Sequence, residues 1–150
     1  MNKTLSIALL FFMTLTVLTI ADGYDIVDAA RSQIGKTLSY DPRYVALDYP
    51  AGDIPIESGV CTDVIIRALR KSRNIDLQKL VHEDMEAHFE KYPQIWGLKR
   101  ADKNIDHRRA PNLQTYFKRS NFNLPTPRNH LTYQPGDIIT CTIPHTYLTS

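Results

Sequence analysis

The chain has 150 residues, of which 43% are hydrophobic and 23% charged, and its formal net charge at pH 7 is +2. This length is typical of one domain, and the hydrophobic fraction is typical of a globular protein rather than a disordered one. The nearly balanced charge argues against a general nucleic-acid binder. Two cysteines are too few for a Cys-rich zinc module or a multi-bridge disulfide scaffold.

Residues 1–21 have the order of a secretory signal peptide. Lys3 precedes the uncharged, mostly apolar run Leu5–Ile20, and Thr19 and Ala21 supply small residues for a cleavage site. An uncleaved membrane anchor is the alternative, although an anchor usually needs about 20 apolar residues. We therefore expect cleavage after residue 21, no stable membrane insertion afterwards, and a single domain over residues 22–150 in an oxidising compartment.

The first part of the mature chain is predicted to hold one helix and then a long loop. Apolar residues at helical spacing indicate a helix over residues 24–34, with Asp22 or Asp25 as its cap and Gly35 at its end. Residues 39–59 contain three prolines and no sustained apolar period, so we expect a long ordered loop there. Loops of this length in compact domains are often functional.

Three further helices and one strand are predicted downstream. An apolar stripe predicts a helix that begins at Cys61, and Asp76 is placed to cap another helix that continues toward Tyr92. Pro111 suits the first turn of a short helix. After a turn at residues 135–137, residues 138–143 have the composition of a strand. Helices that precede a strand, rather than alternate with strands, indicate the α+β class.

The segment Gly59-Val60-Cys61-Thr62-Asp63 carries the clearest chemical signal. It delivers a cysteine to the first turn of a helix, where unpaired backbone N–H groups and the positive end of the helix dipole favour a thiolate. The same amides can bind an oxyanion that forms on a substrate carbonyl. A nucleophilic thiolate also needs an acid–base partner, usually a histidine.

Five histidines are available as that partner. His82 and His88 lie in the helix after Asp76 but do not align cleanly on one face, and His130 has no distinguishing context. His107 lies in a charged segment and is a candidate for binding or orienting a substrate. His145 directly follows the predicted strand. No His-Glu-x-x-His element occurs, and no metal or other cofactor is predicted.

A disulfide between Cys61 and Cys141 is the competing interpretation. Composition alone favours it, because cysteines in an oxidising compartment are usually paired. Such a bond would close a long loop and stabilise the fold by a few kcal/mol.

Several stretches between residues 30 and 137 form a specific pattern. They are Arg31-Ser32-Gln33-Ile34-Gly35, Tyr40-Asp41-Pro42, Tyr49-Pro50-Ala51-Gly52-Asp53-Ile54-Pro55, Gly59-Val60-Cys61-Thr62-Asp63-Val64-Ile65-Ile66-Arg67, Asp76-Leu77-Gln78-Lys79-Leu80-Val81-His82-Glu83-Asp84-Met85, Asn104-Ile105-Asp106-His107-Arg108-Arg109 and Pro135-Gly136-Asp137-Ile138. The pattern resembles domain of unknown function 1287, the family of YijF-like bacterial periplasmic proteins, and covers most of the mature chain. That family is grouped with the NlpC-like, papain-fold cysteine peptidases and amidases, many of which cut peptide or amide bonds in bacterial cell walls.

The resemblance implies a papain-like (NlpC-like) α+β fold, with helices packed on a small antiparallel sheet, and a periplasmic location. It implies Cys61 as the nucleophile and favours that role over the disulfide. In the family the catalytic histidine lies in a Pro-His-x-Gly-Ile-Val stretch after a Trp. In this chain Cys141 lies near the position of the family's Trp, and Pro144-His145 is followed by Thr146–Ser150. The sheet is therefore expected to be incomplete and the domain short at its C-terminus.

Together these observations predict a periplasmic thiol hydrolase, an amidase or endopeptidase acting on cell-wall peptides. Cys61 is the expected nucleophile and His145 the general base, with His107 as the alternate. Residues expected to contact substrate are Tyr40, Tyr49, Asp53, Asp63, Arg67, His107, Arg108 and Arg109, of which Asp63 and Arg67 could instead brace the helix in structural ion pairs. The alternatives are a non-catalytic protein that binds the cell wall or peptides, and an inactive, truncated remnant.

Overall fold

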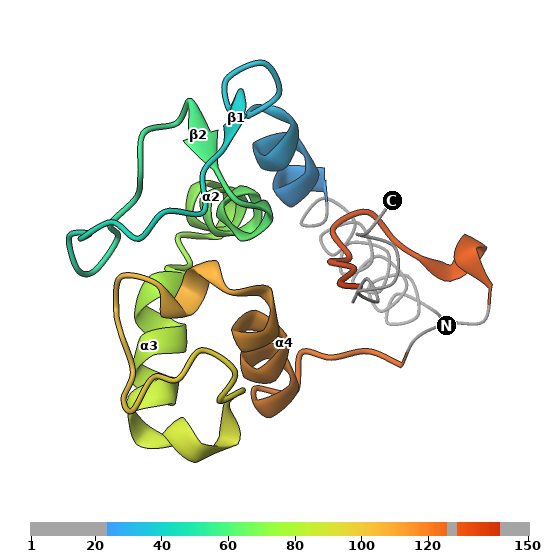
Figure 1. Ribbon diagram of the computed structural model, residues 1–150. Coiled ribbons are helices and arrows are strands. Elements are labelled where there is room, and N and C mark those ends of the chain that lie inside the picture. Colours follow the sequence, from blue (N-terminus) through green and yellow to red (C-terminus); the bar gives the residue numbers. More distant parts are fainter. Residues whose placement is uncertain (1–23, 126–128, 142–150) are drawn as a thin grey trace, which may run out of the picture.

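The computed structural model describes residues 24–125 and 129–141, and this part of the chain is mostly helical (Figure 1). Its elements are a helix over residues 24–31, β1 (Ser39–Tyr40), β2 (Ser58–Gly59), α2 (Cys61–Arg73), α3 (Leu77–Ala87), η1 (Phe89–Lys91), η2 (Asp106–Arg108), α4 (Ala110–Arg119) and η3 (His130–Thr132). The fold is thus α+β in the broad sense. The predicted signal peptide lies outside the described residues, and no helix within them has the length and apolarity that a membrane span requires.

Local sequence signals set the ends of α2 and α3. Cys61 is the first residue of α2, as predicted, and Asn74 ends the helix in the left-handed region with a φ of 54°. Asp76 caps α3, because its side chain accepts a hydrogen bond from the backbone N–H of Gln78 at 3.2 Å. Asp76 also pairs with Arg70 at 2.8 Å. The connection between the two helices is therefore fixed by one carboxylate.

Two helices are shorter than predicted. The first ends at residue 31 and continues as tight turns, in which the N–H of Gln33 bonds the carbonyl of Ala30 and that of Ile34 bonds Arg31. The helix α3 ends at Ala87 because His88 leaves helical geometry, with φ of −143° and ψ of 41°. The apolar spacing that continues beyond it falls on the 3₁₀ turn η1.

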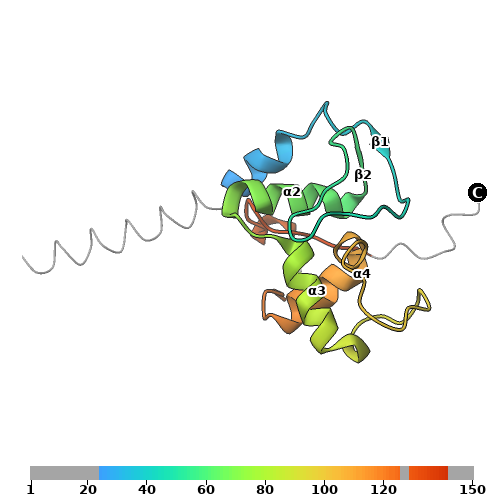
Figure 2. The same ribbon diagram turned by 90° about the vertical axis from the view of Figure 1, so that its left-hand side faces the viewer.

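The hydrophobic core lies between α2, α3 and α4. Its buried residues are Ile66, Leu69, Leu77, Val81, Met85, Tyr92, Leu113 and Tyr116. Figures 1 and 2 show α3 and α4 beside each other, with α2 above them. The short helix η2 packs against all three. The charged segment before α4 is thereby drawn into the interior.

The sheet differs from the expected antiparallel one. β1 and β2 run parallel, with Ser39 opposite Ser58 and Tyr40 opposite Gly59. The loop predicted over residues 39–59 begins and ends in these two strands, which were not foreseen. Residues 41–57 between them carry the chain back to the end at which β1 started, so the two strands point the same way. The prediction of an antiparallel sheet is therefore wrong for the described part of the chain.

The predicted strand over residues 138–143 is absent from its described part, residues 138–141. A strand needs a neighbour to pair with its backbone, and no segment within the described ranges pairs with this one. Ile138 and Ile139 line an apolar groove instead. The preceding turn is present, with the N–H of Asp137 donating to the carbonyl of Gln134 at 3.0 Å.

Candidate functional site

Cys61 stands at the N-terminus of α2 with an exposed side chain and a free thiol. Val60 before it is extended, so the chain turns from β2 into the helix at this point. The backbone N–H groups of a first helical turn have no partner within the helix, and the positive end of the dipole lies beside the sulfur. Cys141 is also free, contrary to the disulfide interpretation. The site therefore presents an accessible sulfur where a helix favours negative charge.

Asp63 fixes the turn that presents Cys61. Its carboxylate accepts the backbone N–H of Val60 at 2.7 Å and binds the guanidinium of Arg108, with Nη2 at 3.0 Å and Nε at 3.1 Å. The side chains of Arg108 and Asp63 are only 2% and 3% exposed. Because a buried carboxylate is costly without a partner, this ion pair holds the start of α2 in place.

Arg108 also fastens two other segments to the same place. Its Nη1 donates to the carbonyl of Arg43 at 3.2 Å, and its Nη2 donates to that of Asp41 at 3.0 Å. Its own carbonyl accepts the hydroxyl of Thr62 at 3.0 Å. One arginine thus ties η2, the loop after β1 and the first turn of α2 together. This bracing is the structural role that the sequence left open for Asp63, and a substrate contact by either residue stays a prediction.

Gly59 permits the close approach of β2 to α2. A Cβ at this position would lie 3.1 Å from Oδ2 of Asp63 and 3.3 Å from its Cβ, which is tighter than side chains normally pack. Tyr40 lies opposite Gly59 in the sheet and is 73% exposed. Tyr40 is therefore placed near the start of α2 with its ring free to meet a ligand.

A second ion pair holds the loop before β2 against α2. Arg67 binds both carboxylate oxygens of Asp53, at 2.8 Å and 3.0 Å, and donates to the carbonyl groups of Ile54 and Ser58. The side chain of Arg67 is 7% exposed and that of Asp53 35%. Bracing is again the role that the contacts show, while substrate binding stays a prediction.

His107 is buried, with 2% of its surface exposed. Burial lowers the pKa of its imidazole to about 4, so the ring is neutral at pH 7. Within residues 24–125 and 129–141 no imidazole forms a hydrogen bond with the thiol of Cys61, and Nδ1 of His107 has no partner there. The other predicted base, His145, lies outside the described residues.

Two other predicted contact residues, Tyr49 and Arg109, pack against ring side chains of the protein. Tyr49 packs edge-on against His82 of α3, with ring centroids 5.4 Å apart, and burial raises the pKa of its hydroxyl. The guanidinium of Arg109 stacks on Trp96, 4.2 Å from the ring centroid, and burial lowers its pKa. Of the predicted set, the structure gathers Tyr40, Asp63 and Arg108 at the start of α2.

A buried His–Asp pair was not foreseen from the sequence. Nδ1 of His82 lies 3.2 Å from Oδ2 of Asp106, which also accepts the N–H of Asp102. Burial raises the pKa of Asp106. The two residues are 24 positions apart, and no local spacing signals such a contact. The described residues contain no group of three or more His, Cys, Asp or Glu that could hold a metal ion.

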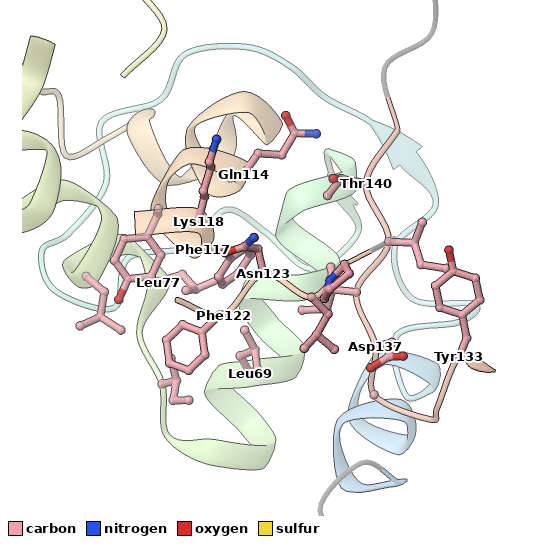
Figure 3. A pocket seen from close by; sticks show the side chains of 18 of the residues that line it. Leu69, Leu77, Gln114, Phe117, Lys118, Phe122, Asn123, Tyr133, Asp137 and Thr140 are labelled. Atoms are coloured by element: carbon pink, nitrogen blue, oxygen red, sulfur yellow. The ribbon is translucent and has the colours of Figure 1, made fainter. Parts of the chain in front are cut away.

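An apolar groove of about 780 Å³ lies beside Leu69 of α2 and Leu77 of α3 (Figure 3). Its walls come from α2, α3 and α4 on one side and from the segment after α4 on the other. They include Leu69, Leu77, Phe117, Phe122 and Ile138. Cys61 does not line this groove. The groove and the thiol are therefore separate features of the fold.

Comparison with known proteins identifies the family. The sequence model of domain of unknown function 1287 matches residues 27–148. The uncharacterized protein YijF of Escherichia coli (strain K12) is 62% identical over 114 residues, which are 76% of this chain and 55% of that protein. The chain thus spans about half the length of this curated relative. No solved structure is significantly similar. The chain therefore belongs to the family of domain of unknown function 1287.

Proposed function

We propose that the protein is a periplasmic thiol hydrolase of papain-like (NlpC-like) type that cleaves amide bonds in cell-wall peptides. The observation that carries the proposal is the exposed, unpaired thiol of Cys61 at the first residue of α2. The segment of residues 59–67 belongs to the match with domain of unknown function 1287, and the grouping of that family with NlpC-like peptidases supports the same role.

The first turn of α2 supplies the groups that the reaction needs. The Cys61 thiolate attacks the carbonyl carbon of the substrate amide and forms a C–S bond. The N–H groups of Cys61 and Thr62 precede the first intrahelical bond and can donate to the oxyanion, whereas the N–H of Asp63 is already bound to the carbonyl of Val60 at 3.0 Å. The imidazole of His145 takes the thiol proton when the thiolate forms. The C–N bond then breaks, and the amine leaves with that proton from the imidazolium.

Hydrolysis of the resulting thioester completes the cycle. The imidazole takes a proton from water, the hydroxide attacks the thioester carbonyl, and the product carboxylate leaves as the thiolate of Cys61 re-forms. The exposed ring of Tyr40 offers one wall for the substrate next to this position.

A non-catalytic protein that binds cell-wall peptides is the second candidate. The observation that favours it is the absence, within the described residues, of an imidazole bonded to the thiol of Cys61, together with the burial of His107. This candidate predicts that wall fragments bind but are not cut, and that Cys61 reacts no faster than an ordinary thiol.

Turnover of purified wall fragments separates the two candidates. We expect Cys61→Ala to abolish release of new amino groups while Cys141→Ala, the matched control at the other free thiol, retains it. We also expect Cys61 to be alkylated by iodoacetamide at pH 7 faster than Cys141 in the same molecule. Unchanged turnover by Cys61→Ala refutes the hydrolase. Binding without turnover by the unmodified protein supports the binding candidate.

A further inference from the structure

A small pocket of about 220 Å³ lies between α2 and the turn that follows the first helix. Its walls are formed by Ala29, Ser32, Gln33, Lys36, Asp53, Ile56, Arg67 and Lys71. Arg67 and Lys71 are six and ten residues beyond Cys61, which places them about 9 Å and 15 Å further along the helix axis. The pocket is therefore distinct from the thiol site.

The charge in this pocket favours an anion. Asp53 is neutralised by its two-pronged contact with Arg67, so the positive charges of Lys36 and Lys71 are not compensated by another lining residue. Nζ of Lys71 donates one hydrogen to the hydroxyl of Ser32 at 2.9 Å, which leaves two for a ligand. Charge-assisted hydrogen bonds from ammonium groups suit a carboxylate.

Gln33 adds a second requirement for the ligand, a hydrogen-bond donor. It is 8% exposed, and its Nε2 donates to the carbonyl of Val64 at 3.0 Å, which fixes the orientation of the amide. Its Oε1 is buried and has no partner within the described part of the chain. A buried acceptor without a donor is unfavourable, so a ligand that brings an N–H donor gains affinity by satisfying it.

We propose that this pocket binds the C-terminal residue of a peptide. The terminal carboxylate pairs with Lys36 and Lys71, and the backbone N–H of the same residue donates to Oε1 of Gln33. A free amino acid is disfavoured, because its ammonium would stand beside two lysines. A simple carboxylate is disfavoured because it leaves Gln33 without a donor. The proposal does not depend on the chemistry of Cys61.

Nuclear magnetic resonance titration of the whole mature chain with N-acetylalanine tests this assignment. The expected result is a saturable shift of the side-chain amide of Gln33, with weaker binding of propionate, of free alanine and of N-acetylalanine methylamide. Equal affinity for the methylamide or for propionate overturns the proposal, and so does the absence of any shift at Gln33.

Substitutions of Lys36 and Lys71 provide a second test of the proposal. Lys71→Met and Lys36→Met keep the apolar stem and remove the charge, and each is expected to weaken binding of N-acetylalanine by about tenfold. Lys99→Met, at an exposed lysine that does not line the pocket, is the matched control. Unchanged affinity in both pocket variants overturns the proposal. Cys61→Ala is expected to bind normally, so failure of the hydrolase and failure of this site are distinguishable.

Discussion

Replacement of Arg108 by methionine tests whether the start of α2 is held by a buried ion pair. Met preserves most of the side-chain volume and removes every hydrogen-bond donor. The carboxylate of Asp63 then loses its cationic partner, and the carbonyl groups of Asp41 and Arg43 lose a donor each. The thiol of Cys61 remains in the chain, and the free energy of unfolding is measured without any substrate.

The expected loss of stability follows from the burial of the ion pair rather than from the distance between its charged atoms. Removing one partner of a buried ion pair costs about 3–5 kcal/mol, because an uncompensated charge stays in the interior. The pair between Arg43 and Asp41 is shorter, at 2.7 Å against 3.0 Å, but its arginine side chain is 82% exposed. Water replaces such a contact readily, so Arg43→Met is expected to change stability little.

Urea unfolding followed by circular dichroism compares these two variants. We expect Arg108→Met to lower the free energy of unfolding by about 3–5 kcal/mol, a large share of the roughly 5–15 kcal/mol of a typical domain. We expect Arg43→Met to leave the urea midpoint nearly unchanged. A loss for Arg108→Met no greater than that for Arg43→Met would refute the reasoning that the buried pair fixes this turn.

Two further predictions concern His107 and Gly52. Because burial lowers the pKa of His107 to about 4, the native state binds fewer protons than the unfolded state below about pH 6.5, and stability falls as pH drops toward 4 by up to about 3 kcal/mol. The raised pKa of Asp106 has the opposite effect on stability. The measurement therefore compares the urea midpoints of wild type and His107→Gln, first at pH 7 and then at pH 4. A midpoint difference that is the same at both pH values would contradict the prediction for His107. Gly52→Ala is expected to lower stability by about 1–3 kcal/mol in thermal unfolding, because the new Cβ would overlap the carbonyl oxygen of Asp48. Gly97→Ala, at a φ of 67° in open space, reports the cost of backbone strain alone, and an equal loss in both variants would contradict the overlap argument.

Local patterns located most of the helices. The prediction that a helix begins at Cys61, the assignment of Asp76 as a cap and the placement of Pro111 near a helix start are all confirmed. Each depends on groups within about one turn of the chain, and sequence reports such neighbours directly. Of the strand expected at residues 138–143, the described residues 138–141 are not a strand, because a strand depends on a partner that the segment itself does not contain.

For the candidate site, the sequence alone determined that a cysteine begins a helix after a glycine-permitted turn. Only the tertiary structure decided what holds that turn, because Asp63 and Arg108 are 45 residues apart and meet only when η2 packs against α2. It also decided that His107 lies in the interior, where desolvation keeps its ring neutral at pH 7. Spacing along a chain encodes contacts within a helix or turn, whereas the burial of a charge depends on which distant segments pack around it.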